Sequence, residues 1–223
     1  ELYWMEQSFA DHDVMYVQQA MGGSSSKMWR TLDHGLTWNQ IPLPNTMRYL
    51  CFTTSATNAD ELWVGYYDGS NGNKVYHTVD AGQNWENITT QTLDGQSVWA
   101  IAHQYGTDGG VYLAMLHGVV YYRNNTMTDW VTYSTGLPVS TEPLRIVPFI
   151  RDQVVRLATW NLGVWEAPCY EASALIANFS AAYNTFFCPG DAVHFVNHSV
   201  CSANATFAWS FPGATPSTST EPY

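Results

Sequence analysis

Two carboxylates and two arginines of this sequence could act on a sugar. Asp68 and Glu142 stand in or beside segments rich in Gly, Asn, Ser, Thr and Pro, as do Arg48 and Arg145. Two carboxyl groups roughly 5 to 9.5 Å apart can cleave a glycosidic bond, and an arginine can hold a carboxylate through paired hydrogen bonds. If the chain is an enzyme, Arg48, Arg145, Glu142 and Asp68 are the candidate catalytic residues.

A second group of residues suits ligand binding. Aromatic rings can stack on the apolar faces of sugars, while neighbouring amides and carboxylates bond to the sugar hydroxyls. The predicted ligand-binding residues are Tyr66, Tyr67, Asp68, Asn71 and Trp160. The alternative is that these side chains pack loops together or contact a neighbouring domain.

The sequence gives little support for a metal ion or an organic cofactor. Of its seven histidines, His194 and His198 alone have His-x-x-x-His spacing, which by itself makes no metal triad, and its four cysteines show no Cys-x-x-Cys pair. The run 68–73, Asp-Gly-Ser-Asn-Gly-Asn, has oxygen-bearing side chains that could hold calcium, but its spacing is not that of an EF-hand loop. We therefore predict a polar hairpin loop there, with no metal site and no cofactor.

The composition limits the class of partner. The chain has 223 residues and a net charge of −11, and Lys27 and Lys74 are its only lysines. A nucleic-acid backbone or an anionic membrane surface needs clustered lysine and arginine, so neither is an expected partner. No apolar run approaches the roughly 20 residues that cross a bilayer, so membrane insertion is not expected. The expected partners are glycans or other surface proteins.

The elements that must position these side chains are repeated. The segment 31–38, Thr-Leu-Asp-His-Gly-Leu-Thr-Trp, returns as 78–85, Thr-Val-Asp-Ala-Gly-Gln-Asn-Trp. A weaker third copy ends at Trp130 and has lost the aspartate and the glycine. Strand-like runs recur around these segments, so we predict four units of roughly 45 residues with four short strands each, the fourth stopping after its third strand. This is the pattern of β-propeller blades.

The repeated segment resembles the Asp-box, or BNR repeat, of sialidase-like propellers: Ser/Thr-x-Asp-x-Gly-x-Thr-Trp. The resemblance implies a turn between the third and fourth strands of a blade, on the face opposite the usual active site. The aspartate would accept backbone hydrogen bonds, the glycine would have a positive φ, and the tryptophan would be buried in a seam. The matching residues, which we expect to be structural, are Thr31, Asp33, Gly35, Trp38, Thr78, Asp80, Gly82 and Trp85.

The same resemblance bears on the size of the domain. Asp-box propellers usually have six or more blades, whereas about four are visible here. We therefore expect residues 1–170 to be the C-terminal part of a larger ring that this chain does not close by itself. The expected fold class is all-β, with propeller blades followed by a truncated immunoglobulin-like β-sandwich.

Residues 171–223 have no blade pattern and form the second predicted domain. The segments 177–181, 188–195 and 207–213 resemble a polycystic-kidney-disease (PKD) domain, in a variant frequent in secreted proteins of the Bacteroidota. The chain stops before the closing strands of that family, so only its N-terminal part is expected. The resemblance implies an extracellular or cell-surface protein exported by type IX secretion.

The cysteines fit this interpretation in part. Cys188 and Cys201 lie 13 residues apart on what should be neighbouring strands of the second domain, so we predict a disulfide between them. The alternative is two buried thiols. Cys51 is expected to be a core thiol, and the pairing of Cys169 is left open.

Two classes of function follow from the sequence. The favoured one is a secreted or cell-surface propeller without catalytic activity, serving adhesion, glycan binding or protein assembly, with the PKD domain as a spacer. The alternative is a glycoside hydrolase of sialidase or xyloglucanase type whose site lies partly in blades outside this sequence. Fold membership does not decide between them.

Overall fold

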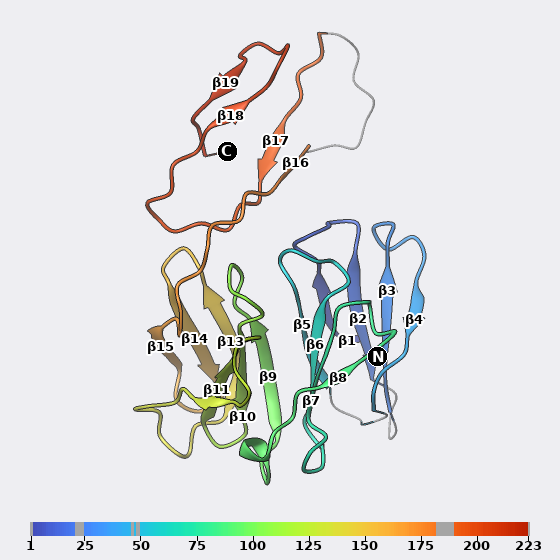
Figure 1. Ribbon diagram of the computed structural model, residues 1–223, viewed down its shortest axis with the longest axis vertical. Coiled ribbons are helices and arrows are strands. Elements are labelled where there is room, and N and C mark those ends of the chain that lie inside the picture. Colours follow the sequence, from blue (N-terminus) through green and yellow to red (C-terminus); the bar gives the residue numbers. More distant parts are fainter. Residues whose placement is uncertain (1, 21–24, 46, 48–49, 182–189, 223) are drawn as a thin grey trace.

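The computed structural model of the protein describes residues 2–20, 25–45, 47, 50–181 and 190–222. Nearly all of its regular structure is β-strand, arranged as separate sheets with a smaller C-terminal part beyond them (Figure 1). The single helical element of these residues is the short 3-10 helix η1 (Gln91–Leu93). Within the described residues, no helix has the length and apolar character that crossing a membrane would require.

Four antiparallel sheets follow one another along the chain, and we call them blades I to IV. Blade I contains β1 (Leu2–Gln7), β2 (Met15–Ala20), β3 (Ser26–Thr31) and β4 (Asn39–Ile41). Blade II contains β5 (Leu50–Thr54), β6 (Leu62–Tyr66), β7 (Val75–Thr78) and β8 (Glu86–Asn87). Blade III contains β9 (Val98–His103), β10 (Val111–Met115), β11 (Val119–Arg123) and β12 (Val131–Thr132). Blade IV has three strands, β13 (Pro143–Phe149), β14 (Val154–Thr159) and β15 (Val164–Pro168), as predicted.

The hydrophobic core lies between the blades. One buried cluster joins blades I and II, a second joins blades II and III, and a third joins blades III and IV. The second strands β6 and β10 are buried at every position because both of their faces are covered. This explains why their sequences are continuous apolar runs rather than alternating ones.

The turns at 31–38 and 78–85, which we call the Asp turns, have the predicted local chemistry. Asp33 accepts hydrogen bonds from the backbone N–H of Thr37 (2.8 Å) and from the Thr37 hydroxyl (2.6 Å). Asp80 accepts the equivalent pair from the backbone (2.8 Å) and the amide (2.7 Å) of Asn84. Each turn connects the third and fourth strands of its blade.

The glycines of the Asp turns have the predicted positive φ, +89° at Gly35 and +85° at Gly82. The residue before each also lies in the left-handed region, with φ of 55° at His34 and 56° at Ala81. Two successive residues in this region make a tight turn that favours glycine at the second position. The sequence pattern is therefore explained by the backbone that it must adopt.

Two of the three repeated tryptophans, Trp85 and Trp130, form hydrogen bonds across the seams between blades. The Trp85 indole N–H donates to the carbonyl of Pro42 (3.0 Å), just after β4, and the Trp130 indole donates to the carbonyl of Ile88 (2.9 Å), just after β8. Trp38 instead donates to Gly35 in its own turn (3.0 Å). Of these three rings, that of Trp130 alone is buried, with 3% exposure. The expectation of largely buried rings is therefore wrong for Trp38 and Trp85, which are half-buried.

The innermost strands β1, β5, β9 and β13 lie around a common centre (Figure 1). β9 packs against both β5 and β13, and β1 contacts β5. No sheet pairing joins blades I and IV in the described part of the chain, but the guanidinium of Arg145 lies 4.9 Å from the centre of the Trp4 ring. The larger ring stays a prediction.

The C-terminal part contains two small sheets. β16 (Phe179–Ala181) pairs with β17 (Phe195–Asn197), and β18 (Trp209–Ser210) pairs with β19 (Thr218–Ser219). Rings of Phe179, Phe195, Trp209 and Phe211 contact one another between the sheets. These contacts place Trp209 and Phe211 on the same side, with their rings stacked.

The expected disulfide is not established. Cys201 is half-buried, as are Cys51 and Cys169, and its expected partner Cys188 lies outside the described residues. The Cys188 pairing therefore stays a prediction. Cys51 packs against the core cluster of blades II and III, and burial raises the pKa of its thiol to about 12.

Candidate functional site

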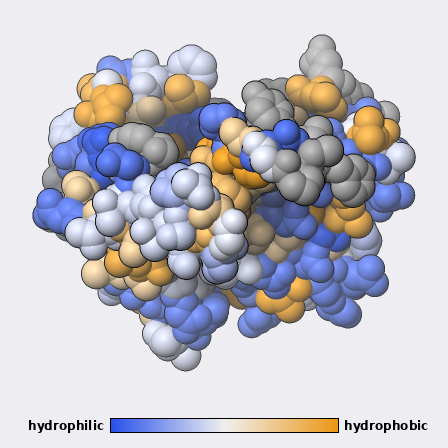
Figure 2. Space-filling model, turned by 90° about the horizontal axis from the view of Figure 1, so that it is seen from above, coloured by the Kyte–Doolittle hydropathy of each residue, from blue (hydrophilic) through white to orange (hydrophobic). Residues whose placement is uncertain are grey.

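The innermost strands of all four blades line one cavity of about 770 Å³, which we call the central cleft. Its walls come from β1, β5, β9 and β13, together with Tyr67 and Trp160 from loops. A volume of this size is typical of ligand pockets. Figure 2 shows the molecule from above as hydrophilic areas mixed with small, separate apolar ones, so an extended apolar patch is not seen on that face.

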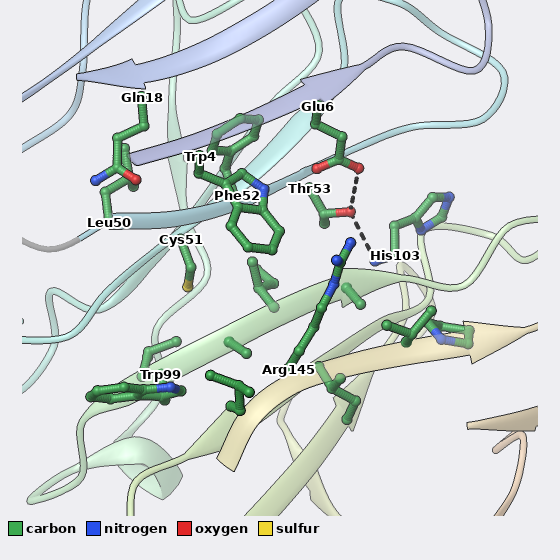
Figure 3. A pocket seen from close by; sticks show the side chains of 18 of the residues that line it. Trp4, Glu6, Gln18, Leu50, Cys51, Phe52, Thr53, Trp99, His103 and Arg145 are labelled. Carbon is green, nitrogen blue, oxygen red and sulfur yellow. Dashed lines mark hydrogen bonds between the residues drawn. The ribbon is translucent and has the colours of Figure 1, made fainter. Parts of the chain in front are cut away.

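One end of the central cleft contains a carboxyl group in an unusual environment. Glu6, from β1, accepts hydrogen bonds of 3.3 Å from the Thr53 hydroxyl and from the hydroxyl and backbone N–H of Thr54. The backbone N–H of His103 in turn donates to the Thr53 hydroxyl (3.2 Å), as the dashed lines in Figure 3 show. Burial outweighs these bonds and raises the pKa of Glu6 to about 7.

Arg145 extends from β13 toward Glu6 and Thr53 (Figure 3). Its guanidinium lies over the Trp4 ring and is close enough to Glu6 to lower the pKa of that carboxyl in part. It forms no ion pair or hydrogen bond with any residue in the described part of the chain. This end of the central cleft therefore presents a positive charge, a carboxyl group and an indole ring together.

Aromatic side chains line other parts of the central cleft. Trp99, at the start of β9, is 37% exposed and meets Tyr67 edge to face, with ring centres 5.5 Å apart. Trp160, in the loop between β14 and β15, is 66% exposed. Rings that keep an exposed face can stack on the apolar face of a sugar.

The predicted ligand-binding residues divide into those that line the central cleft and those that do not. Tyr67 and Trp160 line the central cleft. Tyr66 does not: it is fully buried, and its hydroxyl donates to the carbonyl of Asn45 (3.2 Å), so that prediction is wrong. Asp68 is exposed and Asn71 accepts a hydrogen bond from the backbone of Gly95 (2.9 Å), and neither lines the cleft.

The residues predicted to be catalytic if the chain is an enzyme are not brought together in one site. Arg145 lines the central cleft, but Glu142 and Asp68 are exposed and lie outside its lining. Arg48 lies outside the described residues. Among the described lining residues, Glu6 is the single carboxylate.

Three residues of the central cleft, Glu6, Trp4 and Trp99, were not predicted from the sequence. Strand alternation could have found the first two, because Trp4 and Glu6 are two positions apart and so share a face of β1. A charged residue on the face of an innermost strand is a signal for a central site. The partner strand β5 is about 48 positions further along the chain, and the sequence alone does not pair these strands.

The loop considered for calcium is closed by a lysine. Lys74 donates from Nζ to the carbonyls of Gly69 (2.7 Å) and Gln96 (2.5 Å), and its side chain is buried. An ammonium group thus bonds to these loop carbonyls. No group of three or more His, Cys, Asp or Glu side chains is placed to hold a metal in the part of the chain that the structure describes.

Comparison with known proteins identifies the fold. No protein-family model and no curated protein matches the sequence. Solved structures do match: an ancestral GH74 enzyme has a TM-score of 0.59 at 12% identity, over 88% of this chain and 27% of that chain. The GH74 enzyme of Niastella koreensis has a TM-score of 0.57 at 12% identity, over 75% of this chain and 28% of that chain.

A third match comes from another class of protein. YCF48 from Cyanidioschyzon merolae has a TM-score of 0.50 at 13% identity, over 80% of this chain and 59% of that chain. At these identities the matches show the fold alone, an all-β propeller. The chain spans little more than a quarter of the length of the two GH74 structures.

Proposed function

We propose that this chain is a glycan-binding part of a secreted or cell-surface β-propeller, with the central cleft as its binding site. The observation that carries the proposal is the composition of that cleft, where the exposed rings of Trp99 and Trp160 and the half-buried ring of Tyr67 accompany the polar side chains of Glu6 and Arg145. Sugars combine an apolar ring face with hydroxyls along the edge, so both parts of the lining have a function in binding them.

Binding without hydrolysis is favoured by the number of carboxylates. Glycoside hydrolysis by the common mechanisms uses two carboxyl groups that flank the bond. Among the described lining residues the central cleft offers Glu6 alone. The same module could attach a surface protein to glycans, which is the adhesion role expected from the sequence, and the C-terminal part would serve as a spacer of PKD type.

The competing proposal is a glycoside hydrolase, and one observation favours it. The raised pKa of Glu6, about 7, is suited to a general acid, which must hold a proton near neutral pH. The fold likeness to GH74 enzymes is compatible with this role. The second carboxylate would then come from a part of the protein beyond this chain.

Isothermal titration calorimetry against a panel of neutral and acidic oligosaccharides tests the proposal. We expect at least one oligosaccharide to bind, and Trp99→Ala to weaken its binding about tenfold because the stacking ring is lost. Trp38→Phe, outside the cleft, is the matched control and should leave binding unchanged.

Two outcomes would contradict the proposal. One is the absence of binding to every oligosaccharide in the panel. The other is turnover of a bound oligosaccharide by this chain that Glu6→Gln abolishes, which would replace the binding module with the hydrolase.

A further inference from the structure

The C-terminal part contacts both the first and the last of the four blades. On one side, the backbone N–H of Ala203 donates to the carbonyl of Arg151 (3.0 Å) in the loop between β13 and β14 of blade IV. On the other side, the side-chain amide of Asn178 donates to the carbonyl of Phe9 (2.8 Å) in the loop between β1 and β2 of blade I. Since no sheet pairing joins blades I and IV in the described part of the chain, the C-terminal part is a bridge between them.

The attachment to blade I contains a pair of histidines. His12, from the loop between β1 and β2, and His198, which follows β17, meet edge to face with ring centres 4.2 Å apart. Both residues are half-buried, and Nε2 of His198 lies 3.0 Å from the hydroxyl oxygen of Ser180 on β16. Neutral imidazole rings can pack at this distance, whereas two imidazolium rings would repel each other strongly.

Carboxylates of the same loop do not neutralise this pair. Asp13 forms its ion pair with His34 (2.7 Å), and Asp11 accepts a hydrogen bond from the backbone N–H of Asp13 (3.0 Å). Among the described residues, no carboxylate forms an ion pair with His12 or His198. A proton on both rings would therefore leave two adjacent positive charges without a bonded counter-charge.

The other elements around the pair bring no opposite charge either. β16 contributes the hydroxyl of Ser180, and blade III contributes the phenol of Tyr105, whose pKa is raised by burial to about 12. Burial and the neighbouring His12 lower the pKa of His198 from its ordinary value of 6.5. The pair consequently resists double protonation while the contact is intact, and acid must work against the contact.

A cavity of about 460 Å³, which we call the junction cavity, lies beside the pair. Its lining comes from both parts of the chain: Gln7, Ser8, Phe9, His12, Tyr105, Ser180, Ala181, Val196 and His198. Tyr105 also lines the central cleft, and its ring contacts that of Phe9, with ring centres 5.2 Å apart. Glu6 is close enough to raise the pKa of Tyr105 in part. The junction therefore lies next to the end of the central cleft that contains Glu6.

We propose that the C-terminal part is a pH-sensitive clasp, which holds blade I in place while His12 and His198 are neutral and releases it when both are protonated. β1 lines the central cleft and continues into the loop that carries His12, so release would free one wall of the cleft and weaken ligand binding in acid. This control of the cleft rests on the proposed function, whereas the clasp itself does not.

The expected direction is opposite to that of the overall charge. The chain has a net charge of −11, so acid lowers its general self-repulsion and should draw its parts together. A junction that loosens in acid would therefore report the local histidine pair rather than the charge of the whole molecule.

Hydrogen–deuterium exchange of the 223-residue chain at pH 7.5 and pH 5 tests the clasp without a ligand. Exchange times are scaled for the effect of pH on the intrinsic rate, and β10, which is buried at every position, is the internal reference. In wild type, we expect the protection of residues 8–14 and 176–181 to fall about tenfold at pH 5 relative to β10, because the two charged rings repel each other.

Three variants separate the pair from other effects of acid. His12→Gln and His198→Gln keep a polar side chain without a titrating ring, so each should keep the protection of both segments at pH 5. His194→Gln, at an exposed histidine of the same C-terminal part, is the matched control and should behave as wild type. Unchanged protection in wild type, or the same loss in acid for the two pair variants, would overturn the clasp.

Control of the cleft is tested by calorimetry with the oligosaccharide of the panel that binds most tightly. We expect the affinity of wild type to fall about tenfold from pH 7.5 to pH 5 and that of His198→Gln to fall less. Glu6 titrates in both proteins, so the difference between them reports the clasp. An equal pH dependence in the two proteins would overturn control of the cleft. If no oligosaccharide binds, the proposed function fails with it, and the exchange experiment still decides the clasp.

Discussion

The Asp turns and the central cleft use carboxylates in opposite ways. In the Asp turn of blade I, hydrogen bonds from Thr37 and Thr31 lower the pKa of Asp33 to about 2. In the central cleft, burial raises the pKa of Glu6 to about 7 despite its three hydrogen bonds. A carboxylate whose charge is fully satisfied by local donors stabilises the turn. A carboxyl group whose ionised form is destabilised by burial marks a candidate functional site.

Among the substitutions that test this comparison, Gly82→Ala should have the largest effect on stability. Its φ is +85°, and a Cβ added there would meet the carbonyl oxygen of Pro42 in the neighbouring blade at 2.9 Å. Gly82→Ala should lower the free energy of unfolding by about 2 to 3 kcal/mol, from the strained φ and the displaced seam. Chemical denaturation followed by tryptophan fluorescence measures this.

Gly35→Ala is the matched control because Gly35 has a similar φ of +89° but a freer surrounding, its nearest contact being the Met15 side chain at 3.4 Å. Gly35→Ala should lower the free energy of unfolding by about half as much as Gly82→Ala does. Equal losses of unfolding free energy in the two variants would mean that the close approach to Pro42 does not contribute to the cost of Gly82→Ala.

The pH dependence of stability should separate the two carboxylates. The folded pKa of Glu6 is above its ordinary value of 4.5, so its contribution is complete below about pH 4.5 and is lost as pH rises through about 7. The free energy of unfolding should therefore fall by about 1 to 2 kcal/mol between pH 5 and 8, a figure reduced because Glu6 is partly exposed. Glu6→Gln should flatten that slope.

Asp33 should give the opposite dependence. Its folded pKa lies below the ordinary value of 3.8, so its contribution is present above about pH 4 and is lost as pH falls through about 2. Asp33→Asn should flatten the acid limb of the stability curve and leave the slope between pH 5 and 8 unchanged. A change in that slope would contradict the separation of the two sites.

Replacing one of the three repeated tryptophans by phenylalanine, which removes the indole N–H, should have a smaller effect on stability. Trp130→Phe should lower the free energy of unfolding by about 1 to 2 kcal/mol, because it removes a buried hydrogen bond to Ile88. Trp85→Phe, at a half-buried site, should cost less. Trp38→Phe should cost least, since its bond to Gly35 stays within one turn. The reverse order in thermal denaturation would contradict the assigned seam contacts.

The comparison also explains what the sequence could predict. The Asp turns were predictable because every partner of Asp33 lies within five residues, so spacing alone fixes the chemistry. The four blades followed from the repetition of such turns. The tyrosines at 66 and 67 show the limit: they are adjacent, yet the first is in the core and the second lines the cleft. Strand alternation decides this, and a one-residue error in phase reverses the assignment.

The central cleft could not be predicted in the same way. Glu6 meets Thr53 and Thr54 from another blade, and Arg145 meets Trp4 although 141 positions separate them. These contacts depend on how the blades are arranged around the centre, which no local pattern of residues records.

The most direct test of the account measures ligand binding and stability in the same set of variants. Trp99→Ala and Arg145→Gln change the cleft, whereas Asp80→Asn and Gly82→Ala change an Asp turn. We predict that the cleft variants lose affinity for the oligosaccharide and keep the melting temperature of wild type, while the turn variants lose melting temperature and keep the affinity. Affinity that follows melting temperature across all four variants would contradict the assignment of the central cleft as the binding site.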